Sequence, residues 1–175
     1  MDHAMYGADL LFGPEQMIRR FVKDPSFDQL ICVAIAKHSD FKLEGIEDER
    51  TLLHARLIRD ADKLDNCRVK LEESMETLLD MDEKTVGASP ISPKVWESCK
   101  AEKSVLSADR KTGMDYWMSY LALYFDINFL ETYQIIKEQD YIRRIAERVP
   151  YSREDTKEKV AYTVKKLEEK MNIQP

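Results

Sequence analysis

The chain contains the stretch Ile58-Arg59-Asp60-Ala61-Asp62-Lys63-Leu64-Asp65-Asn66, which places three carboxylates in a segment with the periodicity of a helix. On a helical wheel of about 100° per residue, one apolar arc contains Leu53, Leu57, Ala61 and Leu64. Asp65 falls inside this arc and Asp62 on its rim, while Asp60 lies on the opposite rim. The pattern predicts that Asp62 and Asp65 face the interior. It also predicts that the opposite side of the helix is exposed to solvent. That side carries Arg59, Lys63, Asn66 and Lys70.

An acid that faces the interior needs a partner, because burying an ionised carboxylate alone costs at least about 3 kcal/mol. Two explanations fit the residues. Asp62 and Asp65 belong to a metal or ligand site, or Asp65 bonds a neighbouring helix end and Asp62 pairs with Arg59 one turn earlier. The local pattern leaves both explanations open.

The composition predicts one all-helical domain. The chain has 175 residues, enough for a sizeable core, and only 5 glycines and 6 prolines. No segment keeps the alternation of a strand. The periodicity predicts helices over residues 2–12, 14–23, 26–38, 48–80, 94–106, 114–125, 130–138, 140–149 and 152–171. Residues 81–93 and 107–113 are expected to be loops, and the aromatic segment 114–129 is expected to be core.

Charge and cysteine usage exclude several classes of protein. The net charge of −6 argues against a partner that is a nucleic-acid polymer or an anionic membrane surface. No apolar run approaches the roughly 18 residues of a membrane span, and no signal-peptide pattern is present, so a cytoplasmic protein is expected. The widely spaced Cys32, Cys67 and Cys99 predict neither a disulfide framework nor a thiolate zinc site.

Three motifs in order carry a resemblance to a known family. They are residues 1–8 (MDHAMYGA), residues 34–41 (AIAKHSDF) and residues 57–65 (LIRDADKLD). Together they resemble the C-terminal two thirds of an HD-domain phosphohydrolase, and residues 116–129 are similar to later helices of small bacterial members. The resemblance implies an HD-domain-like helical bundle in a single domain, 1–175. Residues 1–80 would form a partial HD core, with 81–175 a C-terminal helical extension packed on it.

The resemblance also implies a metal site and a substrate class. By position, the metal ligands would be His3, His38 and Asp62, while Asp60 and Asp65 would be structural or would hydrogen-bond to the ligands. The cofactor would be a divalent metal: Mn, Mg, Fe, Co or Zn. Such an ion activates water and neutralises charge on a phosphoryl group. The implied partner is a phosphorylated small molecule or a nucleotide, with self-association into a homo-oligomer as a further expectation.

The chain departs from the family pattern at its most diagnostic point. Its histidines, His3, His38 and His54, are followed by Ala, Ser and Ala, so the His-Asp dipeptide and the first family histidine are absent. We therefore expect an N-terminally incomplete HD protein with little or no hydrolase activity as this chain. His54, on the apolar side of its helix, is interpreted as a packing residue. The alternative function is a non-catalytic helical scaffold that associates through an exposed surface over residues 114–129.

Overall fold

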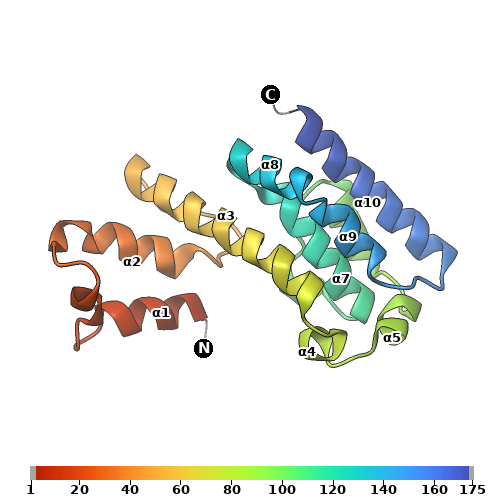
Figure 1. The fold of residues 1–175 in the computed structure, drawn as a ribbon, viewed down its shortest axis with the longest axis horizontal. Helices are drawn as coiled ribbons and strands as arrows, with labels where there is room; N and C mark the ends of the chain where they lie inside the picture. Colours follow the sequence, from red (N-terminus) through yellow and green to blue (C-terminus); the bar gives the residue numbers. More distant parts are fainter. Residues whose placement is uncertain (1–2, 174–175) are drawn as a thin grey trace. The chain divides into compact units, whose positions relative to one another are not determined.

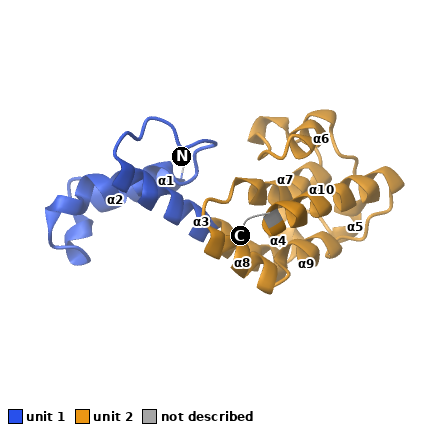
Figure 2. Ribbon diagram, turned by 90° about the horizontal axis from the view of Figure 1, so that it is seen from above, with its two compact units in different colours: residues 1–62 blue, residues 63–175 orange. Residues whose placement is uncertain are grey.

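A computed structural model describes residues 3–173, and the elements in this range are all helices (Figure 1). The predicted all-helical class is therefore confirmed. The chain divides into two compact units, Met1–Asp62 (unit 1) and Lys63–Pro175 (unit 2), as coloured in Figure 2. The division lies inside helix α3 (Glu49–Glu72), whereas the predicted division lay at residue 80. The single domain stays a prediction.

Unit 1 is built around a helical hairpin. Its helices α1 (His3–Phe12) and α2 (Asp28–Lys37) lie side by side (Figure 1). Buried alanines allow their close approach: Ala4, Ala8 and Ala34. The helix expected over residues 14–23 is only the 3-10 turn η1 (Met17–Arg20), because Gln16 adopts a left-handed conformation with φ of 47°. A second 3-10 turn, η2 (Pro25–Phe27), leads into α2.

Helix α3 begins with a side-chain cap and ends earlier than predicted. The Asp48 carboxylate accepts hydrogen bonds from the Thr51 backbone N–H at 2.7 Å and the Thr51 hydroxyl at 2.6 Å. The helix expected over residues 48–80 stops at Glu72, and α4 (Met75–Leu79) follows as a separate helix. Ser74 breaks the run because its extended backbone and hydroxyl cap α4, accepting from the Thr77 N–H at 3.1 Å.

Unit 2 contains the remaining helices in chain order. They are α5 (Glu83–Ala88), α6 (Pro93–Lys100), η3 (Ser107–Asp109), α7 (Gly113–Ala122), η4 (Leu123–Asp126), α8 (Leu130–Glu138), α9 (Tyr141–Glu147) and α10 (Glu154–Ile173). Two predictions here were wrong. The expected loop 81–93 contains α5, which the Asp82 carboxylate caps by accepting from the Thr85 N–H at 2.7 Å. Helix α6 stops at Lys100, two residues before Glu102 takes a left-handed φ of 53°.

Helix α7 forms the centre of the core of unit 2. The side chains of Met114, Trp117, Met118 and Leu121 are fully buried. Helices α5, α6, α9 and α10 pack around α7, and α10 contributes buried Val160 and Leu167. The aromatic segment is therefore core, as predicted, and the alternative that residues 114–129 form an exposed association surface was wrong. In the described part of the chain, no helix is both long and apolar enough to cross a membrane.

A buried carboxylate joins the start of α7 to the loop before α6. Asp115 and Thr112 form a reciprocal capping box at the N-terminus of α7. The Asp115 carboxylate also accepts from the Ser92 N–H at 2.7 Å, the Ser92 hydroxyl at 2.6 Å and the Lys111 N–H at 2.9 Å. Oδ1 accepts from the Ser92 N–H, and Oδ2 accepts the other two bonds and a third from the Thr112 N–H at 3.2 Å, which compensates for the complete burial of this acid.

Helix α5 approaches the backbone at Pro150 through a glycine. A Cβ added at Gly87 would lie 2.3 Å from the Pro150 carbonyl oxygen and 3.1 Å from Val149 Cγ1. The Gly87 carbonyl in turn accepts from the Ser152 N–H at 3.2 Å. The segment between α9 and α10, which contains Pro150 and Ser152, can therefore pack against α5 only because position 87 has no side chain.

Candidate functional site

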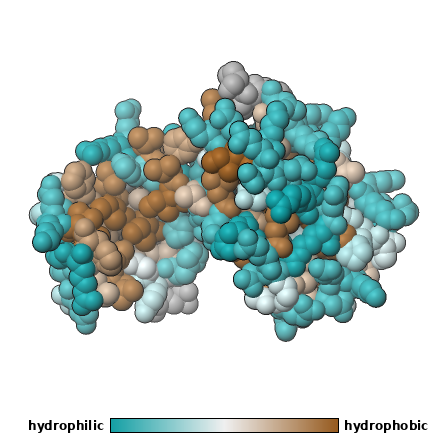
Figure 3. All heavy atoms as spheres, viewed as in Figure 1, coloured by the Kyte–Doolittle hydropathy of each residue, from teal (hydrophilic) through white to brown (hydrophobic). Residues whose placement is uncertain are grey.

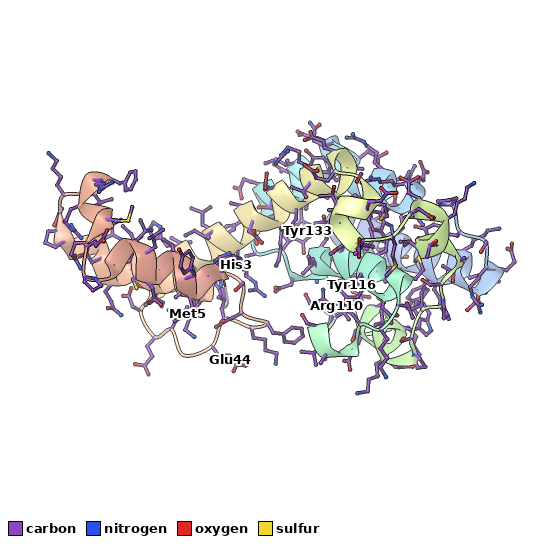
Figure 4. The ribbon with its side chains drawn as sticks, turned by 90° about the horizontal axis from the view of Figure 1, so that it is seen from below. His3, Met5, Glu44, Arg110, Tyr116 and Tyr133 are labelled. Carbon is purple, nitrogen blue, oxygen red and sulfur yellow. The ribbon has the colours of Figure 1, made fainter. Side chains whose placement is uncertain are left out.

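Two of the three predicted metal ligands face each other in unit 1. His3 lies in the first turn of α1 (Figure 4), and His38 caps the C-terminus of α2, as the sequence predicted. Their Nε2 atoms are 3.2 Å apart, and their ring planes meet at 76° with centroids 5.0 Å apart. The hairpin therefore brings together two imidazole nitrogens from residues that are 35 positions apart in the sequence.

The tautomer of His38 follows from its second hydrogen bond. Its Nδ1 lies 2.7 Å from the Ile35 carbonyl oxygen, and a carbonyl only accepts, so Nδ1 carries the proton. In the neutral ring, Nε2 then has a free lone pair, to which His3 Nε2–H donates. Histidines that bind metals usually donate their other ring N–H to such a carbonyl, which fixes the tautomer.

The separation of the two nitrogens suits a shared metal ion. With a metal–nitrogen bond of about 2.1 Å, a 3.2 Å separation corresponds to an angle of about 100° at the ion. That angle lies between the octahedral and tetrahedral values. The pair can therefore supply two adjacent coordination positions and leave the others for water, carboxylate or phosphoryl oxygen.

The carboxylates of α3 do not point where the wheel predicted. Asp62 and Asp65 are exposed, and Asp65 pairs with Arg68 at 3.1 Å, whereas Asp60 is 1% exposed. Side chains of the predicted apolar arc are also exposed to solvent: Leu53 is 51% exposed and Leu57 is 54% exposed. The prediction that Asp62 and Asp65 face the interior was therefore wrong.

The opposite face of α3 is buried because long basic side chains reach acceptors. Lys63 Nζ is 2.9 Å from Asp126 Oδ2 and also donates to the Asp126 carbonyl oxygen, and Lys70 Nζ lies 4.0 Å from the centre of the Tyr120 ring. Burial of a charged group is tolerated when it is paired or stacked in this way. The expectation that Lys63 and Lys70 face solvent was therefore wrong.

Arg59 is the third buried cation of this face, and it hydrogen-bonds to the backbone of His38, one of the two paired histidines. Its Nη1 donates to the His38 carbonyl oxygen at 3.0 Å and to that of Asp40, and its Nη2 donates to the Phe41 carbonyl oxygen at 3.1 Å. The helical wheel predicted that Arg59 faces solvent. Only its position one turn before Asp62 associated it with the site.

The donor set gathered by the structure is smaller than the resemblance implies. Among residues 3–173, no group of three or more His, Cys, Asp or Glu side chains is close enough to hold one metal ion. The structure brings His3 and His38 together, and within the described residues it forms no three-ligand group that includes Asp62. The role of Asp62 as a ligand, and those of Asp60 and Asp65 around it, stay predictions.

Two other groups of reactive type have structural surroundings. Burial raises the pKa of the Cys67 thiol to about 11 and that of Cys99 to about 12, so both are protonated at neutral pH and are poor ligands and nucleophiles. In the loop before α7, the Arg110 guanidinium carbon lies 4.8 Å from the centre of the Tyr116 ring (Figure 4). This stacking and a bond to the Ser107 carbonyl at 3.4 Å hold Arg110 over unit 2.

A comparison of the chain with protein-family models, with curated proteins and with solved structures finds no match.

Proposed function

We propose that this chain is related to the HD-domain metal-dependent phosphohydrolases and that His3 and His38 bind one divalent cation. The observation that carries the proposal is the 3.2 Å approach of the two Nε2 atoms, with His38 Nδ1 fixed on the Ile35 carbonyl. The order of the three sequence motifs supports the family. The exposed Asp62 carboxylate is proposed as a further ligand.

The residues also indicate which ions and substrates fit. Imidazole nitrogens favour Zn, Co and Fe over the harder Mg and Mn, and a carboxylate widens the choice. A bound ion would supply an activated water and neutralise charge on the phosphoryl group of a phosphate ester or nucleotide. Because the 175 residues contain no His-Asp dipeptide, we propose that this polypeptide alone has little or no hydrolase activity.

Removal of either histidine of the pair is expected to weaken metal binding strongly. The full chain should bind one Co²⁺, and both His3→Ala and His38→Ala should weaken binding by about 100-fold or more, beyond the usual effect of a residue that only orients a ligand. Isothermal titration calorimetry gives the affinity, and the visible absorption of bound Co²⁺ reports nitrogen ligation. The matched control is His54→Ala, which removes the remaining histidine and should bind like the wild type.

The same titration tests Asp62. Asp62→Ala should weaken Co²⁺ binding less than the loss of a histidine and should change the Co²⁺ spectrum, because one oxygen ligand is replaced by water. Equal affinity in the wild type, His3→Ala and His38→Ala would refute the histidine site. Metal-dependent hydrolysis of a generic phosphoester at enzymatic turnover would refute the proposal of low activity.

A second candidate function, a helical interaction module, is favoured by the apolar surface of unit 1. Large hydrophobic side chains stand exposed there: Met5, Tyr6, Leu10, Phe21, Phe41, Leu53 and Leu57. Figure 3 shows hydrophobic residues gathered over α1, α2 and the start of α3. The buried apolar residues of unit 1 are mostly alanine, so little of its apolar area is covered by its own core. Exposed patches of this kind favour association.

Negative charges introduced into the exposed apolar surface of unit 1 are expected to prevent self-association of the chain. The double variant Leu53→Glu, Leu57→Glu should remain monomeric over a concentration series in which the wild type gains mass by light scattering coupled to size exclusion. Arg56→Glu, which also adds negative charge to an exposed position of α3, should associate like the wild type. A wild type that stays monomeric throughout would contradict self-association through this face.

A further inference from the structure

We infer that Arg59 is a positioning residue for His38: its guanidinium holds the backbone that follows α2 and thereby aims the imidazole at His3. The inference rests on the proposed function, because it concerns the same histidine pair. Arg59 was predicted to face solvent, and the hydrogen bonds described above join it to backbone carbonyls and not to either imidazole ring.

Arg59 holds the backbone at the end of α2 and just beyond it. The last carbonyls of a helix have no partner within the helix and need another donor. Arg59 supplies one hydrogen bond at this end, from Nη1 to the carbonyl oxygen of the C-cap residue His38, and two just beyond it, from Nη1 to that of Asp40 and from Nη2 to that of Phe41. A guanidinium presents its donors in a rigid plane, so three bonds fix the position of the backbone at residues 38–41.

His38 is held at two points, its imidazole ring and its backbone carbonyl. Its Nδ1–H donates to the Ile35 carbonyl inside α2 at 2.7 Å, and its own carbonyl accepts from Arg59 at 3.0 Å. The first bond sets the tautomer, and the second keeps the final turn from fraying. Together they direct Nε2 at His3, 3.2 Å away.

Arg59 is more buried than the charged side chains at the end of α2. Arg59 is 7% exposed, so water competes little for its three bonds. The nearby Lys37–Asp40 pair is 3.3 Å long, with both side chains more than a third exposed, and pairs of that kind contribute little. Arg56, one turn earlier on α3, is exposed and provides a matched arginine without these bonds.

The test follows the tautomer of His38 in the full chain before any metal is added. Long-range ¹H–¹⁵N spectra, recorded where the rings are neutral, distinguish Nδ1–H from Nε2–H. We expect His38 in the wild type to be the Nδ1–H form and in Arg59→Met to be a mixture, with Arg59→Lys between them. Arg56→Met should match the wild type, and His54 should be unchanged in every variant. Co²⁺ binding should weaken about tenfold in Arg59→Met, the effect typical of residues that orient a ligand.

The outcomes separate this inference from the proposed function. An unchanged His38 tautomer in Arg59→Met would overturn the inference, whatever the Co²⁺ affinity. A changed tautomer in a chain whose wild type binds no Co²⁺ would support the role of Arg59 and refute the metal site. If Arg59→Met does not fold, Arg59→Lys decides: it keeps the charge and loses the planar fork, so a tautomer identical to wild type would overturn the inference.

Discussion

Asp115→Ala is expected to lower the free energy of unfolding by about 3–5 kcal/mol, the range for breaking a buried charged network. The substitution removes the acceptor for the Ser92 N–H and hydroxyl and for the Lys111 and Thr112 N–H groups. These donors remain near a fully buried position, and the capping box of α7 is lost. A loss of this size is a large part of the stability of an ordinary domain.

Urea unfolding monitored by tryptophan fluorescence measures the effect. Trp117 lies in the same helix, and its burial makes the signal report on the core of unit 2. Ser92→Ala, which removes one donor and leaves the carboxylate, should cost only about 1 kcal/mol. Asp65→Ala, at an exposed acid on α3, should change stability by less than about 0.5 kcal/mol. Similar losses in Asp115→Ala and Asp65→Ala would contradict the network.

Gly87→Ala is expected to destabilise the protein by about 2–3 kcal/mol, although alanine is the better helix former. The new Cβ would overlap the Pro150 carbonyl oxygen, 2.3 Å away, and backbone cannot rotate aside as a side chain can. Helix α5 or the turn at Pro150 must shift, which also strains the bond from the Ser152 N–H to the Gly87 carbonyl.

The same substitution at Gly7 provides the matched control. Gly7 is also helical, but its added Cβ would meet Ile35 Cγ2 at 3.6 Å, an ordinary contact. Gly7→Ala should therefore be neutral or should stabilise the fold by up to about 1 kcal/mol. Thermal unfolding by circular dichroism should give shifts of opposite sign for the two variants, or a fall for Gly87→Ala alone. An unchanged midpoint in Gly87→Ala would show that the close approach at Pro150 is absent.

The sequence predicts the helical class and the core of unit 2 because both depend on local patterns. Residues 114–129 have apolar side chains at helical spacing, and most of these side chains lie in the core. Helix α5 was missed and α4 was predicted as the end of a longer helix, since each has only a few residues and is begun by a single capping side chain, Ser74 or Asp82. Such helices depend on packing with distant segments, which a local window does not contain.

The candidate site was predicted in part for the same reason. The position of His38 at a helix end follows from local sequence, and its meeting with His3 was implied only by the family resemblance. The wheel predicted the wrong face of α3 to be buried, because the partners of the buried face are distant in the sequence. Asp126 lies 63 residues after Lys63, and the carbonyls that accept from Arg59 lie 18 to 21 residues before it. A wheel ranks side chains by polarity and contains no information on such acceptors.

The cysteines make each unit observable without any engineered probe. Cys67 and Cys99 are buried thiols of unit 2, whereas Cys32 is a partly buried thiol of unit 1. A thiol reagent reacts with a buried cysteine only when the surrounding structure opens, so the rate of modification measures the free energy of that opening. Mass spectrometry of peptides modified over time would therefore follow the local stability of the two units separately within one native chain.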